Sequence, residues 1–196
     1  MPHGPLPGAA LPGTLVPGTV LLAGTAMAVM MARFGASPVL PAYCYLAAAG
    51  ALLAVLDARE RRLPDLLTLP SYPAALVLLG LAALAVPGGG AHFRGALLGM
   101  TAALAVFLVQ AFAYPAGIGW GDVKLSGILG LYLGWLGPGA LLAGLFLGYL
   151  LAAVAGLGLI AAHRATRKSQ LPFGPFLLAG TLAAIAVSGL APALPW

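Results

Sequence analysis

Charged residues are scarce in this chain of 196 residues. Asp, Glu, Lys and Arg make up 7% of the sequence, 62% of the residues are hydrophobic, and the mean hydropathy is +1.05. Soluble globular domains contain about 25% charged residues. A single core of this size could not hide so much apolar surface from water. The composition therefore excludes an ordinary soluble domain and predicts a protein that resides in the lipid bilayer.

Cysteine and histidine are also rare. The single cysteine, Cys44, lies in an apolar run, which excludes a disulfide within the chain and a four-cysteine zinc site and favours a buried small hydrophobic residue. His3, His92 and His163 are far apart, and no pair has the spacing of metal ligands. We expect no metal site and no cofactor. The few serines, none in a GxSxG context, do not support Ser–His catalysis.

The net charge is nevertheless positive, at +5, with a pI of about 9.8. The nine Lys and Arg residues are separated by long apolar runs and form no stripe with interleaved aromatic residues. This distribution counts against a nucleic-acid partner. It indicates loop charges that face the surface of a membrane.

Long apolar runs separated by Pro, Gly or charge predict an all-α, polytopic transmembrane bundle, because about 20 helical residues cross a bilayer. We expect six or seven spans, since the fifth run is short and Pro17, Gly18 and Gly24 weaken the first. Residues 1–14 are expected to form a flexible cytoplasmic lead-in without a cleaved signal, and residues 15–196 a single membrane domain. The predicted spans lie near residues 15–33, 38–57, 66–86, 94–114, 122–136, 138–162 and 173–193.

The basic residues predict how the spans are oriented, because Lys and Arg are enriched in cytoplasmic loops. If the loop after the second span is cytoplasmic, only Arg33 and Arg94 lie on the outer side. The other seven then lie on the cytoplasmic side: Arg59, Arg61, Arg62, Lys124, Arg164, Arg167 and Lys168. We therefore expect the loop after the second span and the start of the fifth span to face the cytoplasm.

Only four residues are acidic, Asp57, Glu60, Asp65 and Asp122, so each can be weighed separately. An ionisable side chain at the centre of a membrane helix costs about 2.5–3.5 kcal/mol, and those retained at membrane depth are usually functional. Asp57 ends the apolar run AAAGALLAVLD, where the negative end of the helix dipole disfavours an anion. Viewed alone, it could also be a solvated carboxylate at the interface, paired with Arg61.

Asp122 lies in the segment GIGWGDVKLSGILGLYLGW. Gly119 and Gly121 would let the backbone approach another segment closely or adopt a positive φ angle. The aspartate then begins an apolar helix, where unpaired amides and the helix dipole stabilise an anion. The local sequence is equally consistent with a functional carboxylate and with a residue that only caps the helix.

Asp57 and Asp122 become a candidate pair when they are considered together. They are 65 residues apart, and two intervening spans would return the chain to the same membrane face. Aspartic peptidases use two carboxylates that share one proton, one activating water and the other donating to the scissile carbonyl. The sequence therefore predicts an aspartate dyad at the cytoplasmic ends of two spans.

The remaining charged residues near this pair have simpler explanations. Asp65 follows Pro64, which suits a first helical turn, and an aspartate is favourable there, so we assign it to the start of the third span. Glu60 lies among arginines and is interpreted as a solvated charge. Lys124, two residues after Asp122, could neutralise the site or reach a lipid phosphate.

At these residues the chain resembles the type IV prepilin peptidase family. The first matching feature is Asp57 followed by a basic stretch and LPDLLTLP. The second is GWGDVKL, which matches the family's GxGD motif with its downstream Lys, and the third is QLPFGPFLLAG, similar to the family's Pro-Phe-Gly-Pro segment. The three motifs occur in the family's order and cover residues about 52–182, most of the chain.

The resemblance implies that Asp57 and Asp122 are catalytic and that Gly119, Gly121 and Lys124 support the second motif. It further implies cleavage of the basic leader from pilin-like precursors at the cytoplasmic face of the bacterial inner membrane, typically after a glycine and before the apolar helix. The expected partners are thus a prepilin or pseudopilin precursor and the lipid bilayer.

Other motif positions are less directly tied to chemistry. Relatives vary between Asp and Asn at position 65, which agrees with a supporting role for Pro64 and Asp65. The third motif predicts only a break at the start of the last span. It consists of Pro172, Phe173, Gly174 and Pro175.

The chain departs from the larger members of the family in one respect. They carry a cytoplasmic insertion with paired CxxC motifs, and many also methylate the new N-terminus. This chain has one cysteine and resembles the short form, which counts against N-methyltransferase activity.

Two other classes of function fit the composition. In a small transporter or channel, Asp57 and Asp122 would form a proton relay or substrate site, and Gly/Pro breaks would suit discontinuous helices. Such sites usually lie near the midplane of the bilayer, whereas both aspartates map to one boundary. In a membrane scaffold without catalytic activity, the acids would only cap helices.

Overall fold

The computed structural model describes residues 15–60, 63–114, 117–164 and 172–188. Several predictions fall outside these residues. They are the flexible lead-in at residues 1–14, the charges of Arg61, Arg62, Arg167 and Lys168, and the end of the last predicted span.

The described residues form seven helices and no strand, which confirms the predicted all-α fold. Each helix overlaps one predicted span, and among the described helices α1 to α4 and α6 are long and apolar enough to cross a membrane. The helices are α1 (Leu15–Phe34), α2 (Leu40–Glu60), α3 (Asp65–Ala85), α4 (Gly89–Ala113), α5 (Trp120–Leu136), α6 (Pro138–Ala161) and α7 (Gly174–Val187).

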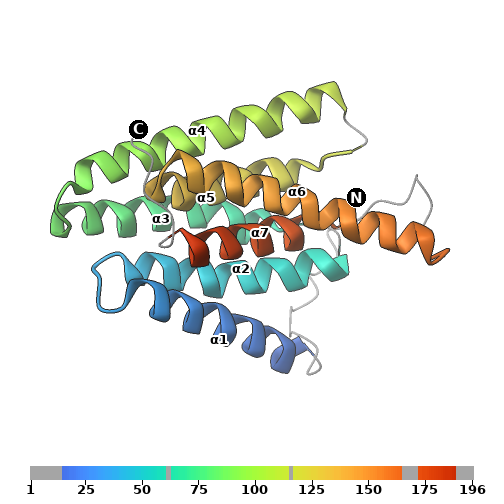
Figure 1. Cartoon of the computed structure of the whole chain (residues 1–196), viewed down its shortest axis with the longest axis horizontal. Coiled ribbons are helices and arrows are strands. Elements are labelled where there is room, and N and C mark those ends of the chain that lie inside the picture. Colours follow the sequence, from blue (N-terminus) through green and yellow to red (C-terminus); the bar gives the residue numbers. More distant parts are fainter. Residues whose placement is uncertain (1–14, 61–62, 115–116, 165–171, 189–196) are drawn as a thin grey trace, which may run out of the picture.

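The helices run side by side along the long axis of the molecule (Figure 1). Helices α1 and α2 form one edge of the bundle and α4 the opposite edge. Helix α5 contacts α3, α4, α6 and α7, whereas α7 also packs against α2 and α1. The short α5 is thus the centre of the bundle, and every residue from Leu125 to Trp135 is buried. Other helices rather than lipid therefore surround α5, the helix that corresponds to the short fifth span predicted from the sequence.

Glycines allow the backbones of neighbouring helices to approach closely around α5. A Cβ atom at Gly99 of α4 would lie 2.4 Å from the carbonyl oxygen of Gly130 of α5, and one at Gly130 would lie 2.5 Å from the carbonyl oxygen of Gly99. Small residues at such contacts are typical of helix packing in membranes, where close van der Waals contact replaces the hydrophobic effect. The same arrangement recurs between α6 and α7, where a Cβ at Gly180 would lie 2.3 Å from the Gly148 nitrogen.

Polar side chains from other helices hold the C-terminal end of α5. The hydroxyl of Tyr43 donates to the carbonyl of Tyr132 at 2.7 Å, and the imidazole Nδ1 of His92 lies 2.9 Å from the carbonyl oxygen of Trp135. Hydrogen bonds between membrane helices contribute about 0.6 kcal/mol on average. His92 therefore has a structural contact with the end of α5 away from the acidic residues.

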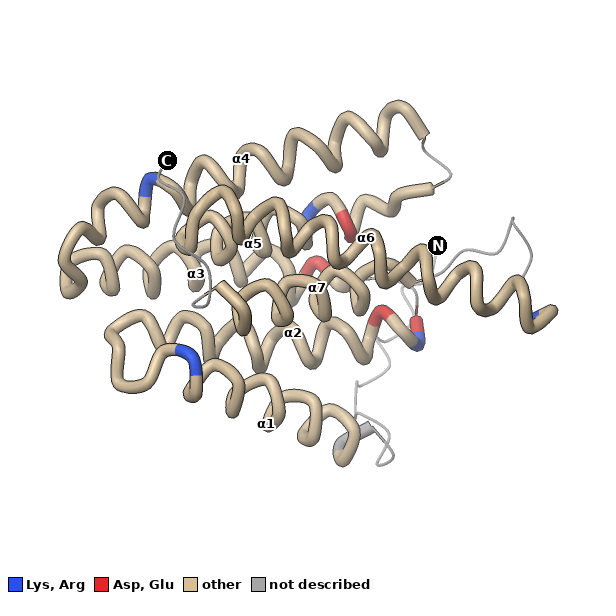
Figure 2. Tube along the Cα trace, in the orientation of Figure 1, with Lys and Arg blue, Asp and Glu red and all other residues tan. Residues whose placement is uncertain are grey.

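The charged residues are distributed unevenly along the bundle. Figure 2 shows Lys and Arg at both ends, whereas Asp and Glu lie only from the middle of the bundle to its right-hand end. Arg59, Lys124 and Arg164 belong to the segments where α2 ends, α5 begins and α6 ends. The chain alternates in direction, so these three segments share one end, as the predicted orientation requires.

Candidate active site

Asp57 lies in the last turn of α2 and is only 5% exposed. Its Oδ2 accepts a hydrogen bond from the backbone N–H of Gly174, 3.0 Å away and 117 residues later in the chain. Because Gly174 is the first residue of α7, the carboxylate meets the positive end of that helix's dipole. The interpretation of Asp57 as a solvated interface carboxylate is therefore wrong. The negative end of the α2 dipole destabilises the Asp57 carboxylate, and the positive end of the α7 dipole offsets this effect.

The third motif brings Gly174 to this position. Phe173, the residue before α7, packs its ring against Tyr149 of α6 and Phe107 of α4, with ring centroids 5.0 Å and 6.2 Å apart. A Cβ atom at Gly174 would lie 2.7 Å from Oδ2 of Asp57, so no larger residue fits without displacing the carboxylate. The aromatic anchor and the glycine together place a free N–H donor against the aspartate.

Asp122 lies in the first turn of α5 and is half-buried. Its Oδ2 accepts a hydrogen bond from the backbone N–H of Gly119, the N-cap of the helix, at 3.3 Å. Asp122 therefore caps the helix, which was one of the two roles considered from the sequence. The capping bond also orients the carboxylate, so it is compatible with a catalytic role. Gly119 has a φ of −76°, so a positive φ is not the reason for this glycine. Gly121 has the close approach that we expected, since its Cβ would lie 2.9 Å from the side chain of Leu63.

Asp65 is the first residue of α3, as predicted, and Pro64 is the N-cap just before the helix rather than its first residue. Lys124 lines the same pocket as the two candidate aspartates, and its ion-pair partner is Asp65. Its Nζ lies 2.6 Å from Oδ1 of Asp65, with the two side chains 34% and 60% exposed. Glu60 is exposed at the end of α2.

A second contact fixes the start of α5 against α3. The hydroxyl of Tyr72 donates to the backbone carbonyl of Lys124 at 2.6 Å. Together with the Asp65 ion pair, this hydrogen bond joins α3 to the first turn of α5, the turn that carries Asp122. The sequence offered no signal for Tyr72, because a tyrosine in an apolar run has no motif around it.

The two candidate aspartates share one polar pocket of about 430 Å³. It lies where the end of α2, the start of α3 and the start of α5 converge. Every predicted site residue except Pro64 contributes to its wall, which consists of Asp57, Leu63, Asp65, Gly119, Trp120, Gly121, Asp122 and Lys124. Two carboxylates facing one water-accessible space can serve as a general acid and a general base on a single water molecule.

Gly174 is the residue of the candidate site that the sequence identified least well. It was noted as part of a Pro/Gly break, but its contact with Asp57 depends on how α2 and α7 pack. A signal was nevertheless present, because the segment PFGP combines a large aromatic residue with a glycine at a helix start. Among the described residues, no group of three His, Cys, Asp or Glu side chains is arranged to hold a metal ion.

Fold and site together define the class of protein. It is a multi-pass helical membrane protein in which two aspartates, from the end of one helix and the start of another, line the same polar pocket. A model of the type IV leader peptidase family matches residues 44–188, a range that contains both aspartates and Gly174. The chain belongs to this family.

Curated relatives agree with the family assignment. A prepilin leader peptidase/N-methyltransferase of Burkholderia pseudomallei (strain 1026b) is 35% identical over 174 residues, covering 84% of this chain and 52% of that protein. A protein of the same name from Aeromonas salmonicida (strain A449) is 34% identical over 137 residues, covering 67% of this chain and 44% of that protein. The chain thus spans about half the length of the curated relatives it matches. No solved structure gives a significant match.

Proposed function

We propose that this protein is an intramembrane aspartic endopeptidase that removes the leader from type IV prepilin-like precursors, with Asp57 and Asp122 as its catalytic dyad. The observation that carries the proposal is the polar pocket into which both aspartates project from different helices. Membership of the type IV leader peptidase family and the name of the relatives support the choice of substrate.

The hydrogen bonds of the two aspartates suit this role. In each carboxylate, Oδ2 accepts a backbone N–H, from Gly174 for Asp57 and from Gly119 for Asp122. These bonds fix the orientation of the group. Among the described residues no hydrogen bond to either Oδ1 is found, so this oxygen can act on water or on the substrate. A group that is held before the substrate binds loses little free energy in becoming ordered during the reaction.

In the proposed reaction the dyad holds one proton. The ionised aspartate takes a proton from water as the water oxygen attacks the scissile carbonyl carbon, and the protonated aspartate donates to the carbonyl oxygen. The aspartate that took the proton from water then donates it to the leaving nitrogen. As the carbon–nitrogen bond breaks, the other aspartate takes a proton from a hydroxyl of the tetrahedral intermediate, so the dyad again holds one proton. General acid–base catalysis of this kind contributes about 10²–10⁴-fold in rate.

We further propose that the dyad faces the cytoplasm from the bacterial inner membrane. Arg59, Lys124 and Arg164 belong to the end of the bundle that carries the acidic residues, whereas Arg33 and Arg94 belong to the other end. An excess of basic residues near the dyad is the pattern expected of the cytoplasmic side. A basic leader would approach the dyad from that side.

Leader cleavage in proteoliposomes tests the proposal. A type IV prepilin precursor is incubated with the wild type and with Asp57→Asn, Asp122→Asn and Asp65→Asn, and the loss of the leader is followed by gel shift. We expect each dyad variant to lose at least about 100-fold in rate, since one proton-transfer group is removed. The amide oxygen of Asn can still accept the backbone N–H, so the local fold is kept. Asp65→Asn, in the same pocket, is the matched control.

Two results would contradict the assignment. If Asp65→Asn were inactive and Asp57→Asn active, the first member of the dyad would be Asp65. If the wild type left every precursor intact while proton flux across the vesicles depended on Asp57 and Asp122, the transporter alternative would replace the peptidase.

A further inference from the structure

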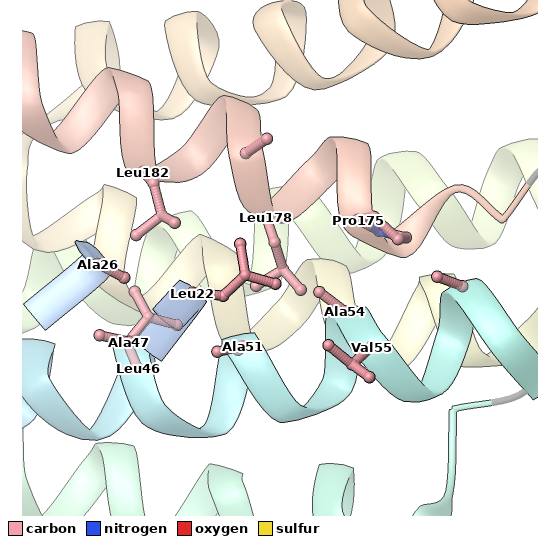
Figure 3. A pocket seen from close by; sticks show the side chains of 13 residues that line it. Leu22, Ala26, Leu46, Ala47, Ala51, Ala54, Val55, Pro175, Leu178 and Leu182 are labelled. Atoms are coloured by element: carbon pink, nitrogen blue, oxygen red, sulfur yellow. The ribbon is translucent and has the colours of Figure 1, made fainter. Parts of the chain in front are cut away.

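A second cavity of about 270 Å³ lies between α1, α2 and α7. Its wall is entirely apolar in side-chain type, and Figure 3 shows Leu178 and Leu182 of α7 pointing toward α2, with Leu22 of α1 between the two helices. We call it the apolar groove. Its principal wall residues are Leu22 of α1, Ala51, Ala54 and Ala58 of α2, and Pro175 and Leu178 of α7.

The apolar groove reaches the part of α2 that carries Asp57. Asp57 lies on α2 between two residues of its wall, Ala54 and Ala58. The carboxylate is bonded to Gly174, and the next residue, Pro175, lines the groove. The hydrogen bond between α2 and α7 therefore links a wall residue of the polar pocket, Asp57, to the residue that precedes Pro175 in the wall of the apolar groove.

The dimensions of the groove decide what it can hold. It follows α2 from Leu46 to Ala58, which is about 18 Å of helix at 1.5 Å per residue. A whole helix, about 10 Å across with its side chains, would not fit in 270 Å³. A row of large apolar side chains from one face of a helix would fit. The alanines of α2 allow the backbone of such a helix to approach closely.

The charges of the polar pocket complement this apolar surface. Three carboxylates, of Asp57, Asp65 and Asp122, line the pocket against one amine, that of Lys124, and this amine is already paired with Asp65. The pocket therefore suits a basic segment. A substrate that matches both surfaces is basic before the cleaved bond and apolar after it.

We propose that the apolar groove binds the apolar segment of the substrate that directly follows the cleaved bond, while the basic leader lies in the polar pocket. This inference rests on the proposed peptidase function. It adds the surface that aligns the substrate so that the bond to be cleaved lies at the dyad. The groove selects precursors with a helix of large apolar side chains next to the cleavage site and places the bond at Asp57.

Filling the groove tests the inference. Ala54→Phe and Ala179→Phe place a large ring in the groove from α2 and from α7, and Ala48→Phe places the same ring on an exposed position of α2 outside it. Cleavage of a type IV prepilin precursor is compared with cleavage of the same precursor shortened just after the scissile bond. We expect the groove variants to lower kcat/KM for the long precursor at least about 10-fold, because large side chains lose their burial. The short precursor and Ala48→Phe should show no change.

A binding measurement gives an answer that does not depend on cleavage. The photoreactive residue benzoylphenylalanine is placed at position 54 or 48 in an Asp122→Asn background, and the long precursor is added in proteoliposomes. We expect crosslinks to the precursor from position 54 and not from position 48. Crosslinks of equal yield from both positions would overturn the inference.

The outcomes separate the groove from the peptidase activity. Unchanged cleavage of the long precursor by both groove variants would overturn the inference, since the groove would then not contribute to substrate binding. Equal losses for the long and short precursors would also overturn it, since the apolar segment would then not matter. If the wild type cleaved neither precursor, the proposed function would fail, and the crosslinks would still decide whether the groove binds an apolar helix.

Discussion

Substituting Gly174 by alanine disturbs the candidate site by a single methyl group. The added Cβ would lie 2.7 Å from Oδ2 and 3.2 Å from Cγ of Asp57. Ordinary contacts of a Cβ atom are 3.4 Å or longer. The carboxylate must therefore retreat by about 0.7 Å, which stretches or breaks its 3.0 Å hydrogen bond to the Gly174 N–H.

The loss of activity has two physical contributions, the weakened hydrogen bond and the displacement of the carboxylate. A hydrogen bond to a charged group contributes about 1.5–3 kcal/mol, which corresponds to a factor of roughly 10 to 150 in rate if the bond is needed in the transition state. A displacement of about 1 Å in a catalytic group costs about 100-fold. We therefore expect Gly174→Ala to lower kcat for leader cleavage by about 10- to 100-fold.

The assay is the proteoliposome cleavage reaction, with thermal unfolding of the same preparation as a check on the fold. Gly158→Ala is the matched control, because a Cβ atom at Gly158 of α6 meets nothing within 4 Å. Full activity of Gly174→Ala, in a variant as stable as the control, would refute the claim that the α7 start positions Asp57. If a lower thermal stability accounted for the lower activity, Gly174 would contribute to the packing of the fold and not specifically to the position of Asp57.

Three further predictions concern the surroundings of the dyad. The exposed ion pair between Asp65 and Lys124 contributes about 0.2–1 kcal/mol, so Asp65→Asn should lower leader cleavage by less than about fivefold. Tyr43→Phe removes the hydrogen bond to the carbonyl of Tyr132 and should lower the stability in detergent by about 0.6–1.7 kcal/mol, measured by thermal unfolding, without changing cleavage at low temperature. Gly99→Ala should lower the Tm, because its Cβ would meet a backbone oxygen of α5 at 2.4 Å.

Each of these predictions has a control. Asp65→Asn is compared with Asp57→Asn, and equal losses would place Asp65 in the dyad. Tyr43→Phe is compared with Tyr114→Phe at an exposed site, and equal stabilities would mean that the buried hydroxyl contributes nothing. Gly24→Ala meets nothing within 4 Å and should be neutral or stabilising by helix propensity, so a fall in Tm equal to that of Gly99→Ala would contradict the packing argument.

Much of the fold could be predicted from the sequence because it depends on local properties. Apolar runs, broken by Pro, Gly and charge, gave seven segments that match the seven described helices. Transfer of apolar residues from water to lipid determines where such helices form, and it does not depend on their neighbours. The burial of α5 was not predicted, since its sequence is as apolar as that of a lipid-facing helix and no periodicity marks its surroundings.

The candidate site also has features that depend on local sequence and features that depend on helix packing. The scarcity of acidic residues singled out Asp57 and Asp122, and the GxGD segment placed Asp122 at a helix start, where its capping bond to Gly119 is local. The pairing of Lys124 with Asp65 and the bond between Tyr72 and the start of α5 join helices that are far apart in the chain. Those contacts follow from helix packing, so the sequence could not identify Asp65 as the partner of Lys124.

The sequence by itself determined that this protein lives in a membrane, that it is helical, and which four acids could carry chemistry, because each depends on composition or on neighbours within a few residues. Only the tertiary structure decided how Asp57 is held. On its own helix the aspartate lies at the unfavourable end of the dipole, and the sequence could offer no compensation. Packing of α7 against α2 brings an N–H donor from 117 residues away to within 3.0 Å of the carboxylate, and the same packing forms the apolar groove beside it.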